Sequence, residues 1–344
     1  MVIKVEDFFS FLHKCLDKTF HNFDQVVLPA PSRNPLLKNY YFTPMTQTGT
    51  YNLDSYRTVD PLKVFFFQPR EKMLPAGFPA IKRLIVGAKG CDLRALHVLD
   101  QAMINKDFVD PGYSHWRHST TIIATDCSEI APTCHCTLTG GKPFAEAGFD
   151  LNLSRLGEQY RVTVGSDKGQ ELLDLMAKNF SMQPAKEGIK SAIEKKRSEI
   201  IRLLHEQNRA FERGDDYTRL QSSGKENWNR ESLTCVGCGA CTHICPTCYC
   251  LILNDETKAQ QFVKVRSMDS CQLHGYARVA GGGSPRPKMF QRFRNRYLCK
   301  FLFMHSNFGE LGCTGCGRCT ETCTAGIDFR QVVRNISETV AVVS

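Results

Sequence analysis

The chain has 344 residues, 42% of them hydrophobic, so it is long enough for about two domains with packed cores. No run of 18 apolar residues occurs, which argues against a membrane span, and the formal net charge of +9 leaves a basic docking face or bound anionic groups open. The 17 cysteines lie in a chain that is too large for a small disulfide scaffold and shows no secretion signal at its start. They therefore indicate metal binding in the reducing cytoplasm.

Residues 1–184 are predicted to form an α/β domain. Apolar residues at helical spacing indicate an amphipathic helix over residues 5–20. Further on, short β-rich apolar runs alternate with helical patterns, which is typical of a layered, partly parallel sheet. These apolar runs are residues 24–30, 62–69, 82–90 and 119–127.

Two glycine-containing stretches in this chain resemble nucleotide-binding loops only superficially. Residues 87–96, GAKGCDLRAL, match neither the P-loop pattern nor G-x-G-x-x-G. Residues 281–287, GGGSPRP, continue into prolines and lack a strand-turn-helix context. No flavin or nucleotide of its own is therefore expected for this chain.

The cysteines of the N-terminal region follow two neighbouring predicted strands. Cys91 begins the helix after one strand, and Cys127, Cys134 and Cys136 follow the next in the pattern C-x6-C-x-C. Because the carboxyl ends of parallel strands converge at one sheet edge, we expect these four thiols to meet and to hold a [4Fe-4S] cluster. Zinc and buried thiols without a metal are the alternatives, and His135 is expected to be packed and not a ligand.

Residues 185–224 are predicted to be a helical connector. Ile193, Ile200 and Leu204 lie on one side of the helical pattern, and Phe211 continues that side. The many charges on the other side are expected to form a solvated face.

Residues 225–344 contain the pattern C-x2-C-x2-C-x3-C twice, starting at Cys235 and at Cys313. Three closely spaced thiolates cap one cubane, and the fourth cysteine of each copy ligates the other cluster, as in bacterial two-cluster ferredoxins. Cluster I is expected to take Cys235, Cys238, Cys241 and Cys323, and cluster II to take Cys313, Cys316, Cys319 and Cys245. Structural zinc would use two separated cysteine pairs, which this pattern does not provide. The predicted fold is a 2[4Fe-4S] bacterial ferredoxin-like α+β domain with a long insertion over residues 246–312.

The glycines within each motif also predict the local backbone conformation. Glycines lie between the thiols, where the backbone must wrap closely around a cluster with positive φ. These glycines are Gly237, Gly239, Gly315 and Gly317.

Bound clusters would also change the net charge of the protein. Each cluster with its four thiolates adds about −2, so two clusters reduce the net charge to about +5 and three reduce it to about +3.

The insertion carries four more cysteines, Cys248, Cys250, Cys271 and Cys299. They are either a further metal site or packed thiols, and packed thiols are the favoured interpretation. The basic segment over residues 288–304 places aromatic residues on one helical face, which indicates core packing. Its arginines are candidates for neutralising a reduced cluster or docking a partner.

Taken together, the motifs GAKGCDLRALHVLD, DC-x6-CHC, CVGCGACTHICPTCYC, RFRNRYLCK and GCTGCGRC resemble one family. They are similar to the iron–sulfur β subunit of cytoplasmic sulfhydrogenases, which is related to the iron–sulfur subunit of anaerobic sulfite reductase and to subunits of heterodisulfide-reductase-type complexes. The resemblance implies ligation at the eight ferredoxin cysteines and at the four N-terminal ones. Relatives tend to have histidine where this chain has Cys299 and tryptophan where it has Met268, so the role of the insertion stays open.

The resemblance further implies an electron-transfer subunit of an oxidoreductase complex of anaerobic metabolism, not catalytic by itself. Its expected partners are a ferredoxin-NADP reductase-like FAD subunit that oxidises NAD(P)H and a terminal hydrogenase, sulfite reductase or heterodisulfide-reductase-type subunit. A self-contained flavin-containing iron–sulfur reductase is the alternative, and a zinc-stabilised nucleic-acid-binding protein is a more remote one. We expect neither nucleic acid nor a membrane as a partner.

Overall fold

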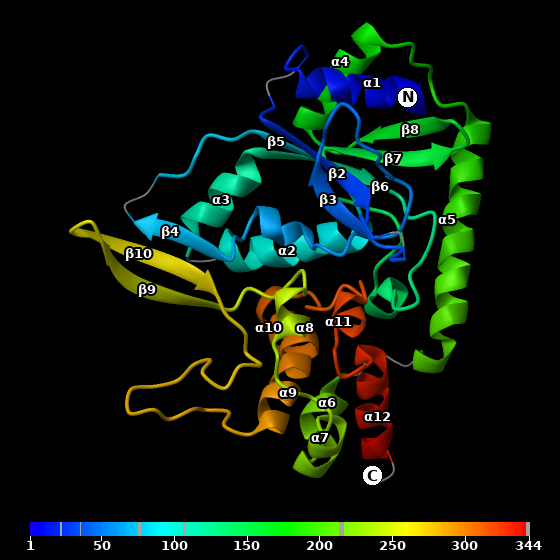
Figure 1. Cartoon of the computed structure of the whole chain (residues 1–344). Coiled ribbons are helices and arrows are strands. Elements are labelled where there is room, and N and C mark those ends of the chain that lie inside the picture. Colours follow the sequence, from blue (N-terminus) through cyan, green and yellow to red (C-terminus); the bar gives the residue numbers. More distant parts are fainter. Residues whose placement is uncertain (21–22, 35, 75–76, 106–107, 213–216, 342–344) are drawn as a thin grey trace.

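The computed structural model describes residues 1–20, 23–34, 36–74, 77–105, 108–212 and 217–341. An N-terminal sheet with helices on both faces stands above a group of C-terminal helices, and one long helix runs along both parts (Figure 1). No helix among the described residues is long and apolar enough to cross a membrane.

Seven strands form the N-terminal sheet, in the order β1-β8-β7-β6-β5-β2-β3. The strands are β1 (Val2–Lys4), β2 (Gln25–Pro31), β3 (Tyr40–Pro44), β5 (Arg83–Ala88), β6 (Thr120–Thr125), β7 (Leu151–Leu156) and β8 (Gln159–Val164). The four central strands β2, β5, β6 and β7 pair in parallel, and the strands at both edges are antiparallel. The prediction of a partly parallel α/β sheet is therefore confirmed.

Helices cover both faces of this sheet. One face packs against α1 (Val5–Leu16) and α4 (Asp167–Asn179), and the other packs against α2 (Gly90–Met103) and α3 (Pro111–His118). The strands β5 and β6 are buried along their whole length because both faces are covered. The predicted N-terminal helix is confirmed, although it ends at Leu16.

The prediction of a strand over residues 62–69 is wrong. This stretch begins with a 3-10 turn, η1 (Leu62–Phe65), and Phe66 and Phe67 then pack into the core beside α2. A short apolar run has the same composition whether it is a strand or a buried turn, so its hydrophobicity could not distinguish the two. The turn also directs the Lys63 side chain into the protein interior, which matters for the metal centres.

The connector is a long helix, α5 (Glu187–Asn208), followed by a 3-10 turn, η3 (Arg209–Phe211). Ile193, Ile200 and Leu204 are buried, as predicted, and most of the charged residues of α5 are exposed. The helix lies beside β7 and reaches the C-terminal helices (Figure 1). It therefore links the two parts of the chain along one side.

The C-terminal part is mostly helical. Its elements are α6 (Thr218–Ser222), α7 (Lys225–Glu231), α8 (Ala240–His243), α9 (Met289–Leu298), the π-helical turn η4 (Cys299–Phe303), α10 (Met304–Phe308), α11 (Arg318–Glu321) and α12 (Phe329–Ala341). The aromatic face predicted for residues 288–304 is buried at Phe293, Tyr297 and Phe301. Tyr297 stacks on Phe329 of α12 with ring centroids 4.5 Å apart, so the insertion forms part of this core.

A second, three-stranded sheet ties the insertion to the N-terminal part. The hairpin of β9 (Leu251–Lys258) and β10 (Gln261–Met268) pairs with β4 (Arg70–Leu74) through β10. Arg266 on β10 is buried and forms ion pairs with Glu71 on β4 and with Asp110, which caps α3. These contacts hold the base of the hairpin against the sheet domain.

Candidate metal centres

Cluster I is predicted at the first cysteine motif, and its four cysteines line one cavity. Three of them precede or lie in α8, and Cys323 comes from the segment after α11. Gly237 and Gly239 have φ of +69° and +77°, as predicted, so the loop curls around the cavity. Cys238 is exposed, which places this cavity at the protein surface.

The second motif forms a similar cavity with the cysteines predicted for cluster II. Cys313, Cys316 and Cys319 line it together with Cys245 from the first motif. Gly315 and Gly317 again have positive φ, of +66° and +73°. Cys319 and Arg296 line both this cavity and that of the first motif. The two cavities are therefore immediate neighbours.

The four N-terminal cysteines surround a third cavity. Cys91 lies in the first turn of α2 after β5, and Cys127 follows β6. Because β5 and β6 are parallel neighbours, their carboxyl ends bring these two thiols to the same edge of the sheet. Cys134 and Cys136 reach the same cavity from the loop that leads into the 3-10 turn η2 (Cys136–Thr139).

The third cavity directly adjoins the second. Cys316 lines both cavities. The loop around Gly315 packs so closely on the Cys134–Cys136 loop that a Cβ at Gly315 would lie 2.4 Å from the Cα of Cys136. Gly317 is equally close to the other side of that loop, because its Cβ would lie 2.2 Å from the carbonyl oxygen of Thr133. Only glycine permits this backbone contact at positive φ.

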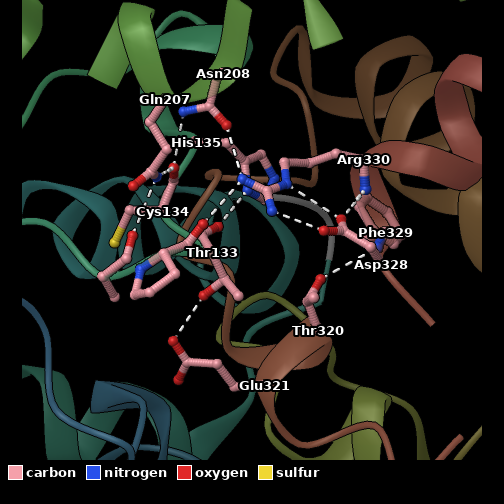
Figure 2. Close-up of polar contacts among 12 residues, drawn as sticks. Thr133, Cys134, His135, Gln207, Asn208, Thr320, Glu321, Asp328, Phe329 and Arg330 are labelled. Atoms are coloured by element: carbon pink, nitrogen blue, oxygen red, sulfur yellow. Dashed lines mark hydrogen bonds and ion pairs between the residues drawn. The ribbon is translucent and has the colours of Figure 1, made fainter. Parts of the chain in front are cut away.

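Hydrogen bonds from α5 hold the Cys134 loop in place (Figure 2). The carbonyl of Cys134 accepts hydrogen bonds from Gln207 at 2.8 Å and from Asn208 at 2.9 Å. On the opposite side, the hydroxyl of Thr133 donates to the Glu321 carboxylate at 2.6 Å. The loop is thus fixed between the connector helix and the second cysteine motif.

Arg330 extends this network to α12. Its guanidinium donates to the carboxylate of Asp328 at 2.6 Å, to the side chain of Asn208 at 2.8 Å and to the Pro132 carbonyl at 3.1 Å. It also lies over the ring of Phe211, 4.6 Å from the ring centroid. One largely buried side chain therefore joins α12, α5 and the Cys134 loop.

His135 lies between the second and third cavities. Its Nδ1 is 2.8 Å from the Thr133 carbonyl and therefore acts as a donor, and its Nε2 is 3.8 Å from the sulfur of Cys313. Burial lowers the pKa of His135 to about 4, so the ring is neutral at physiological pH. The sequence predicts a merely packed ring, and the structure adds that it contacts a predicted ligand of cluster II.

Buried cations surround the cavities. Burial by itself lowers the pKa of Arg296, but the thiolates of Cys241 and Cys319 raise it well above its usual value. Arg57 is also buried, lines the third cavity and donates to the carbonyl of Cys316 at 2.6 Å. Lys89, buried near Cys127, donates to the Leu53 carbonyl at 2.8 Å. The positive charges of Arg57 and Arg296 stabilise anionic groups in the cavities, whereas burial lowers the pKa of Lys89.

The thiols themselves fit metal ligation. Burial raises the pKa of all four thiols of the third cavity, that of Cys127 to about 12. They are therefore neutral thiols unless a metal binds and displaces their protons. Four sulfurs around each cavity, with buried cations beside them, are the donor set and the charge that a [4Fe-4S] group requires. The cavities fit that group.

Some residues of these centres were not found from the sequence. Arg318, in the second motif, forms a fully buried ion pair of 2.8 Å with Asp92, the neighbour of Cys91. A basic residue between two ligands was the available signal for Arg318, and Lys89 falls in the stretch that superficially resembles a phosphate-binding loop. Nothing in the local sequence around Arg57 marks it, because its partners lie far along the chain.

The insertion cysteines lie beside the second cavity. The thiol of Cys248 contacts that of Cys245, and the thiol of Cys250 contacts that of Cys271. Burial raises the pKa of Cys299, and the nearby sulfurs of Cys250 and Cys245 raise it further. Within the described part of the chain, no group of three or more His, Cys, Asp or Glu side chains is arranged to hold a single metal ion.

Adjoining cysteine-lined cavities built on paired C-x2-C-x2-C-x3-C motifs define the class of iron–sulfur proteins with two [4Fe-4S] sites. In agreement, residues 234–327 match the family described as the 4Fe-4S dicluster domain. The chain therefore combines an N-terminal mixed α/β sheet domain with a C-terminal 4Fe-4S dicluster domain, which implies two [4Fe-4S] clusters.

The particular family follows from the comparison of the whole chain. Over 309 residues it is 31% identical to the sulfhydrogenase 2 subunit beta of Pyrococcus furiosus, a match that covers 87% of this chain and 89% of that protein. No solved structure matches the chain significantly. The chain belongs to the sulfhydrogenase β-subunit family, so the family resemblance predicted from the sequence is confirmed. It is an iron–sulfur electron-transfer subunit.

Proposed function

We propose that this chain carries three [4Fe-4S] clusters and relays single electrons between an NAD(P)H-oxidising FAD subunit and a terminal catalytic subunit. The ligands of this proposal come from the three cavities. Cluster I binds Cys235, Cys238, Cys241 and Cys323; cluster II binds Cys313, Cys316, Cys319 and Cys245; and the third cluster binds Cys91, Cys127, Cys134 and Cys136. The dicluster part then has the ferredoxin-like arrangement in which each motif lends its fourth cysteine to the other cluster.

One observation carries this proposal: neighbouring cavities share lining residues. Cys316 belongs to the walls of the third and second cavities, and Cys319 and Arg296 belong to those of the second and first. The three sites therefore form a continuous row in the order third, II, I. A [4Fe-4S] cluster exchanges one electron at a time, whereas a flavin receives a hydride as two electrons, so a row of such sites separates the two steps.

The ends of the row indicate where partners dock. At one end, Cys238 is exposed, and the apolar side chains of Val236 and Leu233 beside it are also largely exposed. At the other end, the third cavity lies at the edge of the N-terminal sheet. This arrangement supports one partner at the first motif and the other at the N-terminal domain, in a hetero-oligomeric complex. The relative from Pyrococcus furiosus, itself named as a subunit of a sulfhydrogenase, supports such a complex.

The experiment that tests the third cluster compares iron and acid-labile sulfide in the anaerobically purified wild type and in a Cys134→Ser, Cys136→Ser variant. Cys15→Ser is the matched control, because Cys15 is buried in α1 and lines none of the three cavities. We expect about twelve iron in the wild type and in the control, and about eight in the double variant. EPR spectra of the dithionite-reduced proteins should lose one cluster signal in parallel.

Two results would contradict the proposal. Equal iron contents in the wild type and the double variant would leave the N-terminal cysteines without a cluster, and the relay would then start in the dicluster domain. Stoichiometric flavin in the purified chain, together with NADH oxidation by the chain alone, would support a self-contained reductase and remove the need for a flavoprotein partner.

A further inference from the structure

Buried arginines occur at several places in the described part of the chain, and nearly all of them have oxygen acceptors. They are Arg57, Arg83, Arg266, Arg292, Arg296 and Arg318. A buried guanidinium needs such acceptors, because an unpaired charge away from water is costly. With one exception, each of these arginines donates to a carbonyl or carboxylate oxygen.

The exception is Arg296 in α9, which is 6% exposed. Its Nε has no hydrogen-bond partner. No hydrogen bond or ion pair joins the rest of its guanidinium to an oxygen of any residue that the structure describes. A buried cation with five N–H groups is thus left without acceptors from the chain itself.

Arg292, one turn earlier in α9, shows that this helix can supply an arginine with acceptors. It is also buried, and its guanidinium donates to the carbonyls of Gln272 at 3.0 Å, of Arg286 at 3.0 Å and of Pro287 at 2.8 Å. The lack of oxygen acceptors is therefore specific to position 296.

Arg296 lines the cavity of the first cysteine motif and also that of the second. Burial lowers its pKa, but the sulfurs of Cys241 and Cys319 more than offset this and hold the pKa well above its usual value. Cys241 is assigned to cluster I and Cys319 to cluster II. The side chain therefore lies between sulfurs that belong to two different sites.

The ring of Phe329 supports this side chain. The guanidinium carbon of Arg296 lies over the ring, 4.6 Å from its centroid, and the ring in turn stacks on Tyr297. A guanidinium over an aromatic ring keeps its N–H groups available, because they all lie in the guanidinium plane and form a rigid fork. Such a fork can donate to acceptors on two sides at once.

We propose that Arg296 donates N–H···S hydrogen bonds to the sulfurs of both cluster I and cluster II. Hydrogen bonds to sulfur stabilise the more negative, reduced state and thereby raise the reduction potential. One donor shared by two neighbouring sites raises both potentials together, so an electron passes between them without a large energy step. The proposal rests on the ligands assigned to clusters I and II under the proposed function and does not depend on the third cluster.

EPR-monitored redox titrations of the anaerobically purified wild type, Arg296→Gln and Arg296→Lys test this role. Arg296→Gln should lower the potentials of both clusters. Lysine keeps the positive charge but lacks the planar fork, so Arg296→Lys should still lower the potential of at least one cluster. Arg294→Gln is the matched control in the same helix, because Arg294 donates to the carbonyl of Gln221, and it should keep the wild-type potentials.

A direct measurement of the hydrogen bonds is electron spin-echo spectroscopy of the reduced proteins with ¹⁵N in arginine only. This label separates the guanidinium from backbone amides near the clusters. We expect the ¹⁵N couplings at clusters I and II to be present in the wild type and in Arg294→Gln and to disappear in Arg296→Gln.

Two results would overturn the proposal. Wild-type potentials in Arg296→Lys would mean that only the charge at this position matters, and unchanged ¹⁵N couplings in Arg296→Gln would mean that Arg296 is not the donor. A wrong ligand assignment would appear elsewhere, as unchanged iron in a Cys323→Ala variant, so the two failures are distinguishable.

Discussion

The amide of His135 donates a 2.8 Å hydrogen bond to the carbonyl of Gly315. This bond joins the loop of the N-terminal cysteines to the loop of the second ferredoxin motif, backbone to backbone. A relay needs its sites to be close together, because electron transfer weakens steeply with distance. The glycine at position 315 is what allows the two loops to approach, since a side chain there would overlap Cys136.

Replacing Gly315 by alanine should therefore separate these loops. The new methyl group would lie 2.4 Å from the Cα of Cys136, and this backbone cannot move away cheaply. We expect loss of about four iron, those of the third site, and a lower thermal midpoint. Iron analysis and differential scanning calorimetry of the anaerobic protein would measure both.

Gly326→Ala is the matched control. Gly326 also has a positive φ, +65°, but no neighbouring atom lies near the position that a Cβ would take there. It should show only the backbone strain of about 1–2 kcal/mol that alanine suffers in this conformation, and it should keep all its iron. Equal iron loss in both variants would mean that strain and not overlap is responsible.

Arg296→Gln should lower the reduction potentials of clusters I and II. Arg296 is buried and lines both cavities, so its positive charge favours the reduced, more negative state. Removing one charge about 4 Å away at an effective dielectric constant near 20 removes about 4 kcal/mol of interaction, which corresponds to a shift of the potential by about 180 mV. An EPR-monitored redox titration would measure the shift. Arg294→Gln is the control, because Arg294 bonds to the carbonyl of Gln221 at the surface and should leave the potentials unchanged.

Asp92→Ala should destabilise the junction between the sheet domain and the dicluster domain. It removes the partner of Arg318 in a pair whose side chains are both 1% exposed. An unpaired buried guanidinium costs about 3–5 kcal/mol, which chemical denaturation would detect. The surface pair of Arg334 and Glu338 offers a control, since Glu338→Ala should change stability little. A comparable loss of stability in both variants would show that the buried pair of Asp92 and Arg318 contributes no more to stability than the surface pair.

Asp328→Asn should weaken the Arg330 network by about 1.5–3 kcal/mol, the range for hydrogen bonds to charged groups. Burial raises the pKa of Asp328, but hydrogen bonds from Arg330 more than offset this and hold the pKa below its usual value. The carboxylate therefore stabilises the folded state above the ordinary carboxyl pKa, and this contribution is lost only as pH falls through the lowered one.

The difference in thermal midpoint between wild type and Asp328→Asn should consequently stay constant between about pH 8 and pH 5.5. A difference that shrinks within this range would show that the pKa of Asp328 in the folded state lies above its ordinary value and not below it. Asp167→Asn, at an exposed residue near the start of α4, is a neutral comparison for the loss of one carboxylate.

Local patterns were sufficient to predict the parts of this protein that depend on neighbouring residues. Three thiols within seven residues, with glycines between them, predicted the dicluster domain because the loop around a cluster is made from one short segment. The alternation of apolar runs and helical patterns predicted the parallel sheet. The parallel sheet in turn predicted that Cys91 and Cys127 lie close together, because parallel strands end at a common edge of the sheet. The prediction of a strand over residues 62–69 was wrong, since a buried turn is as apolar as a buried strand.

The sequence by itself thus determined the class of protein, the ferredoxin motifs and the α/β character of the first domain. Only the tertiary structure decided that the third cavity adjoins the second, that the insertion hairpin pairs with β4, and that Arg57 and Lys63 reach the cysteine sites. The physical reason is separation along the chain: Arg57 and Cys316 lie 259 residues apart, so nothing in the neighbourhood of either one encodes their contact. Such contacts arise only when both domains pack together, and it is this packing that sets separate cysteine loops in one row.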